Sequence, residues 1–522
     1  MSGERTRNSL RNSTYALVFY VLNLALTFLS RRVFIDHIGA ELMGLGTTVG
    51  TILEMLNLAE LGLGAATTAV LYKPLHDGDR GAVAELMTLQ GWFYRRVTVV
   101  VLTVSAALLP FFPQIFADME APTWYAYVTF AAFLPWPLAS YMFNYKQILL
   151  SADQKEYRVT QVYKLPVLVK TVIQMVAVVL LPMGYIWWLA IHVGYTAYAT
   201  IVMRRTVRRE YPWLADSELS GRELMKRHPG VLTKTRQLII HRIAAVALRN
   251  SAYLGILAYI DLETVTSYGN YMMIVTGLAM LDDAVFSGLQ GSVGDMIAQG
   301  DRRKTASIFW ELFSIKFYIG SVFTFGMLLL SGRFIELWIG PGYGLSATAE
   351  RLIVAIMFIN VTRSIVDQFI AAKGQYGDIW APAVEASLNI GLSLTLGRHY
   401  GLEGILAGVL TSLILVVVIW KPYYLIRRGG LKLTESGDSL RQYWVTYLKH
   451  TILATGSGVT VWGMTRLLPE MGDWDACRLM TYAVMTVGVY VVLLAVVSYM
   501  TSEGSRTFIQ RAANMIRDKR AK

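Results

Sequence analysis

Long apolar stretches, separated by short polar loops, run through almost the whole chain. About fourteen of them reach about 20 residues, the length that an α-helix needs to cross a hydrocarbon core of about 30 Å. We place them at 13–33, 46–70, 97–116, 124–146, 159–181, 185–203, 237–259, 266–290, 309–331, 350–371, 382–398, 403–426, 444–465 and 478–500. The pattern predicts an all-α membrane protein with no soluble domain of useful size.

Basic residues mark one set of alternate loops and both termini. The opposite loops are short, and the loop over 112–123 holds no Lys or Arg. The positive-inside rule therefore places the basic loops and both termini in the cytoplasm. In the longest basic loop, 204–236, we expect the Tyr-Pro-Trp segment at 211–213 to interrupt any helix. Tryptophans near predicted helix ends are expected in the aromatic belts at the membrane interfaces: Trp124, Trp136, Trp187, Trp188 and Trp338.

Composition and charge exclude several classes of partner. The net charge is +12 and 54% of the residues are hydrophobic. Because the basic residues lie in loops beside the membrane, they suit anionic lipid, and we expect no nucleic-acid partner. The single Cys477 excludes an intramolecular disulfide, and no Cys/His cluster has the spacing of metal ligands. We therefore expect no metal site and no cofactor.

An internal repeat divides the chain. Gly78-Asp79-Arg80 follows the second apolar stretch, and Gly300-Asp301-Arg302 follows the eighth, about 222 residues later. Two parallel halves of six spans are typical of transporters. We predict an N-terminal lobe over 1–215, a C-terminal lobe over 216–430, and a segment over 431–522 with two additional helices and a basic cytoplasmic tail.

Basic side chains occur at membrane depth, where each costs about 2.5 to 3.5 kcal/mol. Arg242 and Arg249 share one face of the seventh span, Lys170 lies in the fifth and Arg363 in the tenth. One interpretation is a hydrated cavity in which these residues bind an anion, since the guanidinium fork matches phosphate oxygens. The alternative is a set of ion pairs that join helices. Arg363 and Asp367, four residues apart, could pair with each other.

Acidic side chains are present at the same depth. Glu54 and Glu60 lie in the second span, and Asp283 lies in the eighth at the position that the repeat matches to Glu60. They could bind a coupling ion or pair with a neighbouring Arg. The sequence leaves both interpretations open.

Four segments carry a resemblance to a known family. They are FIDHIGAELMGLG at 34–46, LAELGLGAA at 58–66, LLSADQ at 149–154, and GLEGILAG at 401–408 after Ala-Lys-Gly at 372–374. Over about residues 10 to 430 the chain resembles bacterial O-antigen-type polysaccharide flippases of the MATE-like MOP exporter superfamily. The resemblance implies 12 to 14 helices in two lobes, no nucleotide site, and export of an undecaprenyl-diphosphate-linked oligosaccharide across the inner membrane by alternating access.

The resemblance also implies the partners. They are the polyprenyl-diphosphate-linked glycan, membrane lipids and polysaccharide polymerase machinery, and the chain is expected to be a monomer. Arg249, Arg242 and Lys170 match the lumenal basic residues of the family by depth and type, not through a motif. By analogy with the related flippase for the peptidoglycan precursor, the two additional helices are expected to provide a groove for the lipid tail.

Two other functions are alternatives. A MATE-type drug or cation antiporter has the same fold but needs an acidic cavity, whereas the deep residues here lean basic. A membrane enzyme that uses the same lipid carrier needs a large outer loop or an acidic motif in a substantial first loop. The first outer loop here is short, and Asp36 and Glu41 are interpreted as polar residues at helix ends. We therefore expect no catalytic residues and no enzyme.

Overall fold

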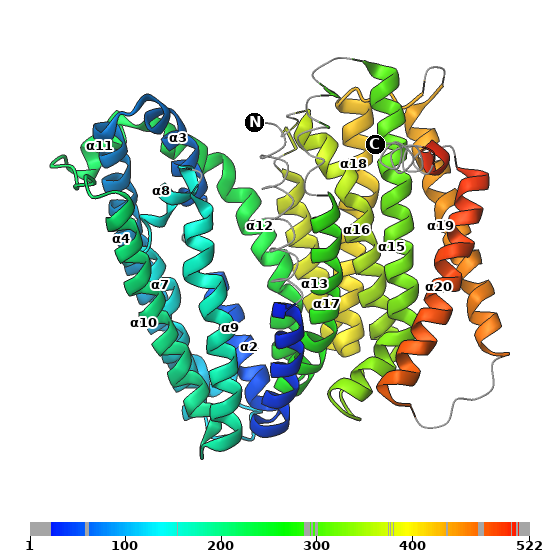
Figure 1. The fold of residues 1–522 in the computed structure, drawn as a ribbon, viewed down its shortest axis with the longest axis horizontal. Helices are drawn as coiled ribbons and strands as arrows, with labels where there is room; N and C mark the ends of the chain where they lie inside the picture. Colours follow the sequence, from blue (N-terminus) through cyan, green and yellow to red (C-terminus); the bar gives the residue numbers. More distant parts are fainter. Residues whose placement is uncertain are drawn as a thin grey trace, which may run out of the picture. The chain divides into compact units, whose positions relative to one another are not determined.

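The protein is all-α, which confirms the predicted fold class (Figure 1). The computed structural model describes residues 22–57, 62–153, 155–286, 293, 296–297, 301–373, 375, 377–378, 380–434, 437–467, 474–502, 504–507 and 510, and no strand occurs among them. For 234, 236–242 and 284–285 only the backbone is described. The chain packs as two compact units, Met1–Thr266 and Ser267–Lys522.

The first unit consists of long helices joined by short ones. A helix over 22–38 ends at Gly39, whose φ of 91° lies in the left-handed region that favours glycine. The helices that follow are α2 (Ala40–Leu56), α3 (Leu63–Asp77), α4 (Arg80–Leu108), α5 (Phe112–Ile115), α6 (Trp124–Phe133), α7 (Pro135–Met142), α8 (Gln147–Ala152), α9 (Glu156–Leu180), α10 (Gly184–Glu210), α11 (Gly221–Arg227) and α12 (Pro229–Tyr259). α7 packs against α4 and α10, and α2 packs against α6 and α12.

A close approach of two backbones fixes the position of α2. A Cβ atom built on Gly44 of α2 would lie 2.0 Å from the carbonyl oxygen of Leu262, so only glycine fits there. Nearby, the hydroxyl of Thr266 donates a hydrogen bond to the carbonyl of Ala40 (2.7 Å). α2 is therefore held against the turn between α12 and α13.

The second unit is built around a very long helix. α13 (Leu262–Phe286) enters it from the first unit, and then come α15 (Arg302–Trp338), α16 (Ala347–Ala372), α17 (Trp380–Ser412), a π-helical segment (Leu413–Trp420), α18 (Lys421–Tyr423), a second π-helical segment (Tyr424–Arg428), α19 (Ser439–Thr465) and α20 (Ala476–Thr501). α15 packs against α16, α19 and α20 (Figure 1). Inside α17, Gly401 (φ 57°, ψ −134°) breaks the helix between the eleventh and twelfth predicted spans.

Membrane-length helices occur in both units. Seven segments in the described part of the chain are long and apolar enough to cross a bilayer: Arg80–Ile115, Glu156–Leu180, Gly184–Glu210, Arg302–Trp338, Ala347–Ala372, Trp380–Arg428 and Ala476–Thr501. Each predicted apolar stretch overlaps at least one helix. The stretch at 46–70 is not one helix as expected, because α2 ends at Leu56 and Gly62, with a left-handed φ of 81°, precedes α3.

The two copies of the Gly-Asp-Arg motif have the same local structure. Asp79 precedes α4, and its carboxylate accepts a hydrogen bond from the backbone N–H of Ala82 (2.9 Å). Asp301 precedes α15 and accepts from the N–H of Lys304 (3.0 Å). Each Asp therefore caps a membrane-length helix. The lobe boundaries at 215 and 430 stay a prediction of the repeat, and α12 packs with α2 and α3 in the first unit.

Candidate functional site

The first unit contains a cavity of about 260 Å³ with a mixed aromatic and polar lining. α2 contributes Gly50, Leu53 and Glu54, and Asn57 follows at its end; Phe133, Trp136, Pro137 and His192 come from α6, α7 and α10. Leu134 separates α6 from α7, and Phe133 and Trp136 on either side of it line the same cavity. The cavity therefore combines rings with hydrogen-bonding groups, as ligand sites do.

Aromatic contacts hold Trp136 in place. Its ring stacks on Tyr195 of α10 (centroids 5.5 Å apart, planes 16° apart) and meets Tyr163 of α9 edge to face (5.7 Å). The hydroxyl of Tyr195 donates to the carbonyl of Tyr163 (3.2 Å), and that of Tyr163 donates to Oε1 of Gln147 (2.8 Å). The indole is fixed between two helices, yet 37% of the residue stays exposed.

Arg249 lies next to this cavity. Its Nη1 is 3.5 Å from Oε1 of Glu54, which itself lines the cavity. This ion pair joins α2 to α12, and it is not fully buried, because the side chain of Arg249 is 65% exposed and that of Glu54 is 40% exposed. A guanidinium carries five N–H donors, and one contact leaves most of them available to a ligand. The structure thus brings together two predicted site residues that lie far apart in the sequence.

Lys170 contacts the same aromatic group. Its Nζ lies 5.2 Å from the centroid of the Tyr195 ring, within the range of a cation–π contact. It also interacts electrostatically with His192. Lys170, Tyr195 and Trp136 therefore form a continuous series of contacts that leads to the cavity.

Two predicted site residues lie partly or wholly outside the part of the chain that the structure describes. The backbone of Arg242 belongs to the continuous helix α12, seven residues before Arg249, and thus lies on the same helix face; its side chain is not described. Glu60 lies outside the described residues. The roles of both stay predictions.

Arg363 is engaged in the second unit. Its Nε lies 3.4 Å from Asp367 and its Nη1 lies 3.8 Å from Glu385 of α17. Lys421 also contacts Asp367 (2.6 Å). The pairing of Arg363 with Asp367, predicted as the alternative to substrate binding, is present in a network of two cations and two acids that joins α16, α17 and α18.

Asp283 is exposed, whereas its neighbour Asp282 is buried. Oδ2 of Asp282 lies 2.5 Å from Nζ of Lys316 on α15, and both side chains are less than a tenth exposed. The Nζ of Lys316 also lies 3.7 Å from the centroid of Phe286. Asp282 thus joins α13 to α15, and the adjacent Asp283 remains accessible.

The comparisons with solved structures agree on the fold. The lipid II flippase MurJ in an inward closed conformation aligns with a TM-score of 0.62 at 12% identity, covering 93% of this chain and 99% of that chain. An inward-facing multidrug resistance MATE family transporter of the MOP superfamily aligns with a TM-score of 0.59 at 12% identity, covering 79% of this chain and 96% of that chain. This chain therefore shares the fold of these two transporters. No protein-family model and no curated protein sequence matched the chain.

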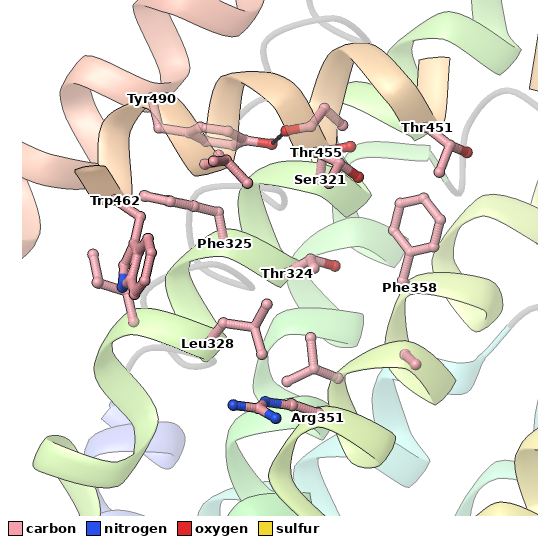
Figure 2. A pocket seen from close by; sticks show the side chains of 16 residues that line it. Ser321, Thr324, Phe325, Leu328, Arg351, Phe358, Thr451, Thr455, Trp462 and Tyr490 are labelled. Atoms are coloured by element: carbon pink, nitrogen blue, oxygen red, sulfur yellow. Dashed lines mark hydrogen bonds between the residues drawn. The ribbon is translucent and has the colours of Figure 1, made fainter. Parts of the chain in front are cut away.

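In the second unit, α19 and α20 border an apolar cavity. It has a volume of about 550 Å³ and lies between α15, α16, α19 and α20. Figure 2 shows Phe325, Leu328, Trp462 and Tyr490 along its walls and the guanidinium of Arg351 at one end. α19 and α20 therefore help to form this cavity, and its use as a groove for a lipid tail stays a prediction.

A polar cluster joins α9 to α10 outside the membrane-length segments. Asp153, in the LLSADQ segment of the resemblance, accepts hydrogen bonds from Tyr211 (2.7 Å) and lies 2.9 Å from Lys155. Partial burial opposes the charged form, but the hydrogen bonds from Lys155 and Tyr211 outweigh it and lower the pKa of the Asp153 carboxyl. The hydrogen bond with Asp153 is also the main reason why the pKa of Lys155 is raised.

The roles of two residues, Lys316 and Trp136, were not predicted from the sequence. Lys316 is a charged residue in the middle of a predicted span, so the criterion that identified Lys170 could have found it. Trp136 was assigned to an interfacial belt, but it lines the cavity of the first unit. No local pattern distinguishes these two positions for a Trp.

Proposed function

We propose that this chain is a transporter that flips an undecaprenyl-diphosphate-linked oligosaccharide across the bacterial inner membrane by alternating access. The observation that carries the proposal is the exposed guanidinium of Arg249 beside an aromatic and polar cavity in a MOP-type transporter fold. A diphosphate with sugars cannot cross hydrocarbon unaided, whereas the polyprenyl tail has no reason to leave it. A carrier for such a lipid needs polar contacts for the headgroup and an apolar surface for the tail.

Arg249 is assigned to the diphosphate. Its charge persists at any working pH, and its planar donors match two phosphate oxygens at once. The carboxylate of Glu54 is the only anion that it contacts among the described residues, and that contact is partly exposed. A diphosphate with more charge can displace it. Lys170 and Arg242 are assigned to the same anion, and Arg363 is a further candidate in the second unit.

The groove between α15, α16, α19 and α20 is assigned to the tail. Its walls are mostly apolar, and Arg351 supplies a positive charge at one end (Figure 2). The flippase structure covers 93% of this chain and the MATE transporter 79%, which favours a lipid carrier over the antiporter. Glu54 and Asp283, with Glu60, remain candidates for ion coupling.

The hypothesis of a membrane enzyme has less support than that of a flippase. Glu41, one of the two acids in the first outer segment, accepts hydrogen bonds from the backbone N–H groups of Glu120 (2.5 Å) and Ala121 (3.1 Å). Its two oxygens thus hold a loop, which fits a polar residue at a helix end.

A flipping assay separates these functions. The full chain is reconstituted in vesicles with the lipid-linked oligosaccharide that accumulates in cells lacking this chain, and a lectin outside the vesicles reports sugar exposure. We expect the outer pool to be replenished only in vesicles that contain the protein. Uptake of a cationic dye driven by a proton or Na⁺ gradient, with no sugar movement, would instead indicate the antiporter.

A further inference from the structure

The cavity beside Arg249 has the chemistry of a sugar site. A pyranose ring presents apolar C–H faces and a rim of hydroxyl groups. An aromatic ring can pack on the apolar C–H face of the sugar, and hydrogen-bond acceptors or amides around that aromatic ring can bind the hydroxyl groups. Trp136 supplies the ring surface here, and Glu54, Asn57 and His192 supply the polar groups.

Asn57 carries an unused hydrogen-bonding atom. Its Oδ1 is buried and has no hydrogen-bond partner among the described residues. Leaving such an acceptor unpaired is unfavourable, and a hydroxyl donor from a ligand would satisfy it. Glu54 adds carboxylate oxygens that accept only. The cavity thus offers acceptors to hydroxyl donors.

The size of the cavity limits its occupant. Pockets for drug-sized ligands have volumes of about 300 to 1,000 Å³, and this cavity has about 260 Å³. It therefore suits one sugar ring and not a chain of several. The stacking of Trp136 on Tyr195 holds the indole in a fixed orientation. A sugar ring that packs on the indole therefore costs little side-chain entropy of Trp136 on binding.

The position of Glu54 identifies which sugar would bind. One carboxylate both lines the cavity and contacts Arg249 at 3.5 Å. A ring in the cavity therefore lies directly beside the group assigned to the diphosphate. We propose that this cavity binds the first sugar of the lipid-linked glycan, the one attached to the diphosphate, with Trp136 as the stacking surface and Asn57 and Glu54 as hydroxyl acceptors. The proposal rests on the proposed function, because it requires a glycan joined to a diphosphate.

Saturation-transfer NMR tests the sugar site directly. The full chain in detergent is mixed with a set of methyl glycosides of neutral hexoses and N-acetylhexosamines. We expect saturation of the ring C–H protons of at least one of them with the wild-type protein. Trp136→Ala should weaken the interaction by about tenfold, and Trp136→Phe should retain part of it. Asn57→Ala should also weaken it.

The matched control is Trp187→Ala. Trp187 lies on α10, is 46% exposed and does not line the cavity, so its loss should leave the sugar signal unchanged. Absence of saturation from the wild-type protein to every glycoside would overturn the proposal. An unchanged signal in the folded Trp136→Ala and Asn57→Ala variants would do the same.

Binding of sugar-free undecaprenyl diphosphate, measured by native mass spectrometry, tests the proposed function separately. Trp187→Ala should bind it as the wild type does, whereas Arg249→Ala should bind it about ten to a hundred times more weakly. Diphosphate binding without a sugar signal would leave the proposed function intact and remove the sugar site. A sugar signal without diphosphate binding would remove the proposed function instead.

Discussion

A single arginine, Arg249, carries most of the proposed chemistry. A charge-assisted hydrogen bond is worth about 1.5 to 3 kcal/mol, so Arg249→Ala should weaken binding of the lipid-linked substrate by about one to two orders of magnitude. Because the pair with Glu54 is largely exposed, its loss should change the melting temperature little. We expect surface polysaccharide to disappear at normal protein levels. Arg249→Lys should restore export partly, since a point charge replaces the fork.

Glu54→Gln separates a substrate contact from a structural pair. If the pair only joined α2 to α12, both substitutions would lower stability and export alike. Normal export by folded Arg249→Ala would exclude the diphosphate role.

Adjacent acids, Asp282 and Asp283, should behave differently. Removing one partner of a buried pair costs about 3 to 5 kcal/mol, so Lys316→Ala should strongly lower the melting temperature. Asp282→Asn with Lys316→Met should recover much of the loss. Asp283→Asn should leave stability unchanged because its side chain is exposed.

The same variants test ion coupling. If Asp283 binds a coupling ion, its neutralisation should change the dependence of flipping on pH or Na⁺ in proteoliposomes. Identical dependence in wild type and Asp283→Asn would exclude that role.

At the scale of elements, the polar cluster of Asp153, Lys155 and Tyr211, which joins the start of α9 to the end of α10, should be sensitive to acid. The folded-state pKa of Asp153 is lowered from 3.8, so its contribution to stability is present above that value and is lost as pH falls through the folded-state pKa. The melting temperature of Asp153→Asn should therefore be below that of the wild type at neutral pH. The melting temperatures of the wild type and of Asp153→Asn should become equal as the pH is lowered. A difference in melting temperature that does not depend on pH would contradict a stabilising role of the Asp153 carboxylate.

The groove formed with α19 and α20 makes a prediction about the tail. Ala355 of α16 lines the groove, and Ala355→Phe should fill part of it. We expect slower flipping of a long-chain polyprenyl substrate and little effect on a short-chain analogue. Val496→Phe, at a 51% exposed position of α20 outside the groove, is the control. Equal slowing of both substrates would indicate a folding defect.

Helices could be predicted from sequence because length and hydropathy are local properties. The break at Gly401 falls in the predicted gap between two spans, whereas the division of 46–70 by Gly62 was not foreseen, because apolar residues continue on both sides of it. The pairs Arg249–Glu54 and Lys316–Asp282 join different helices, and no local pattern encodes which helices meet. Residue types and the i, i+4 pair of Arg363 with Asp367 were therefore predictable, whereas partners on other helices were not.

At the scale of the whole molecule, the asymmetry of Lys and Arg predicts the orientation in the membrane. In a Cys477-free background, Asp79→Cys and Asp301→Cys should react with an impermeant thiol reagent only after the cells are opened. Ala121→Cys, in an outer loop, is the control and should react in intact cells. Labelling of position 79 from outside would reverse the topology.

Gly44 shows how a residue that touches no ligand can govern the whole site. Any side chain there meets the Leu262 carbonyl and forces α2 away from the α12–α13 turn. The same helix carries Glu54 to Arg249 and ends at Asn57, so the anion contact and the cavity would be displaced together. Random mutagenesis under selection for export should therefore recover only glycine at position 44. A substitution there would abolish export although it changes no charged residue and no residue that contacts the ligand.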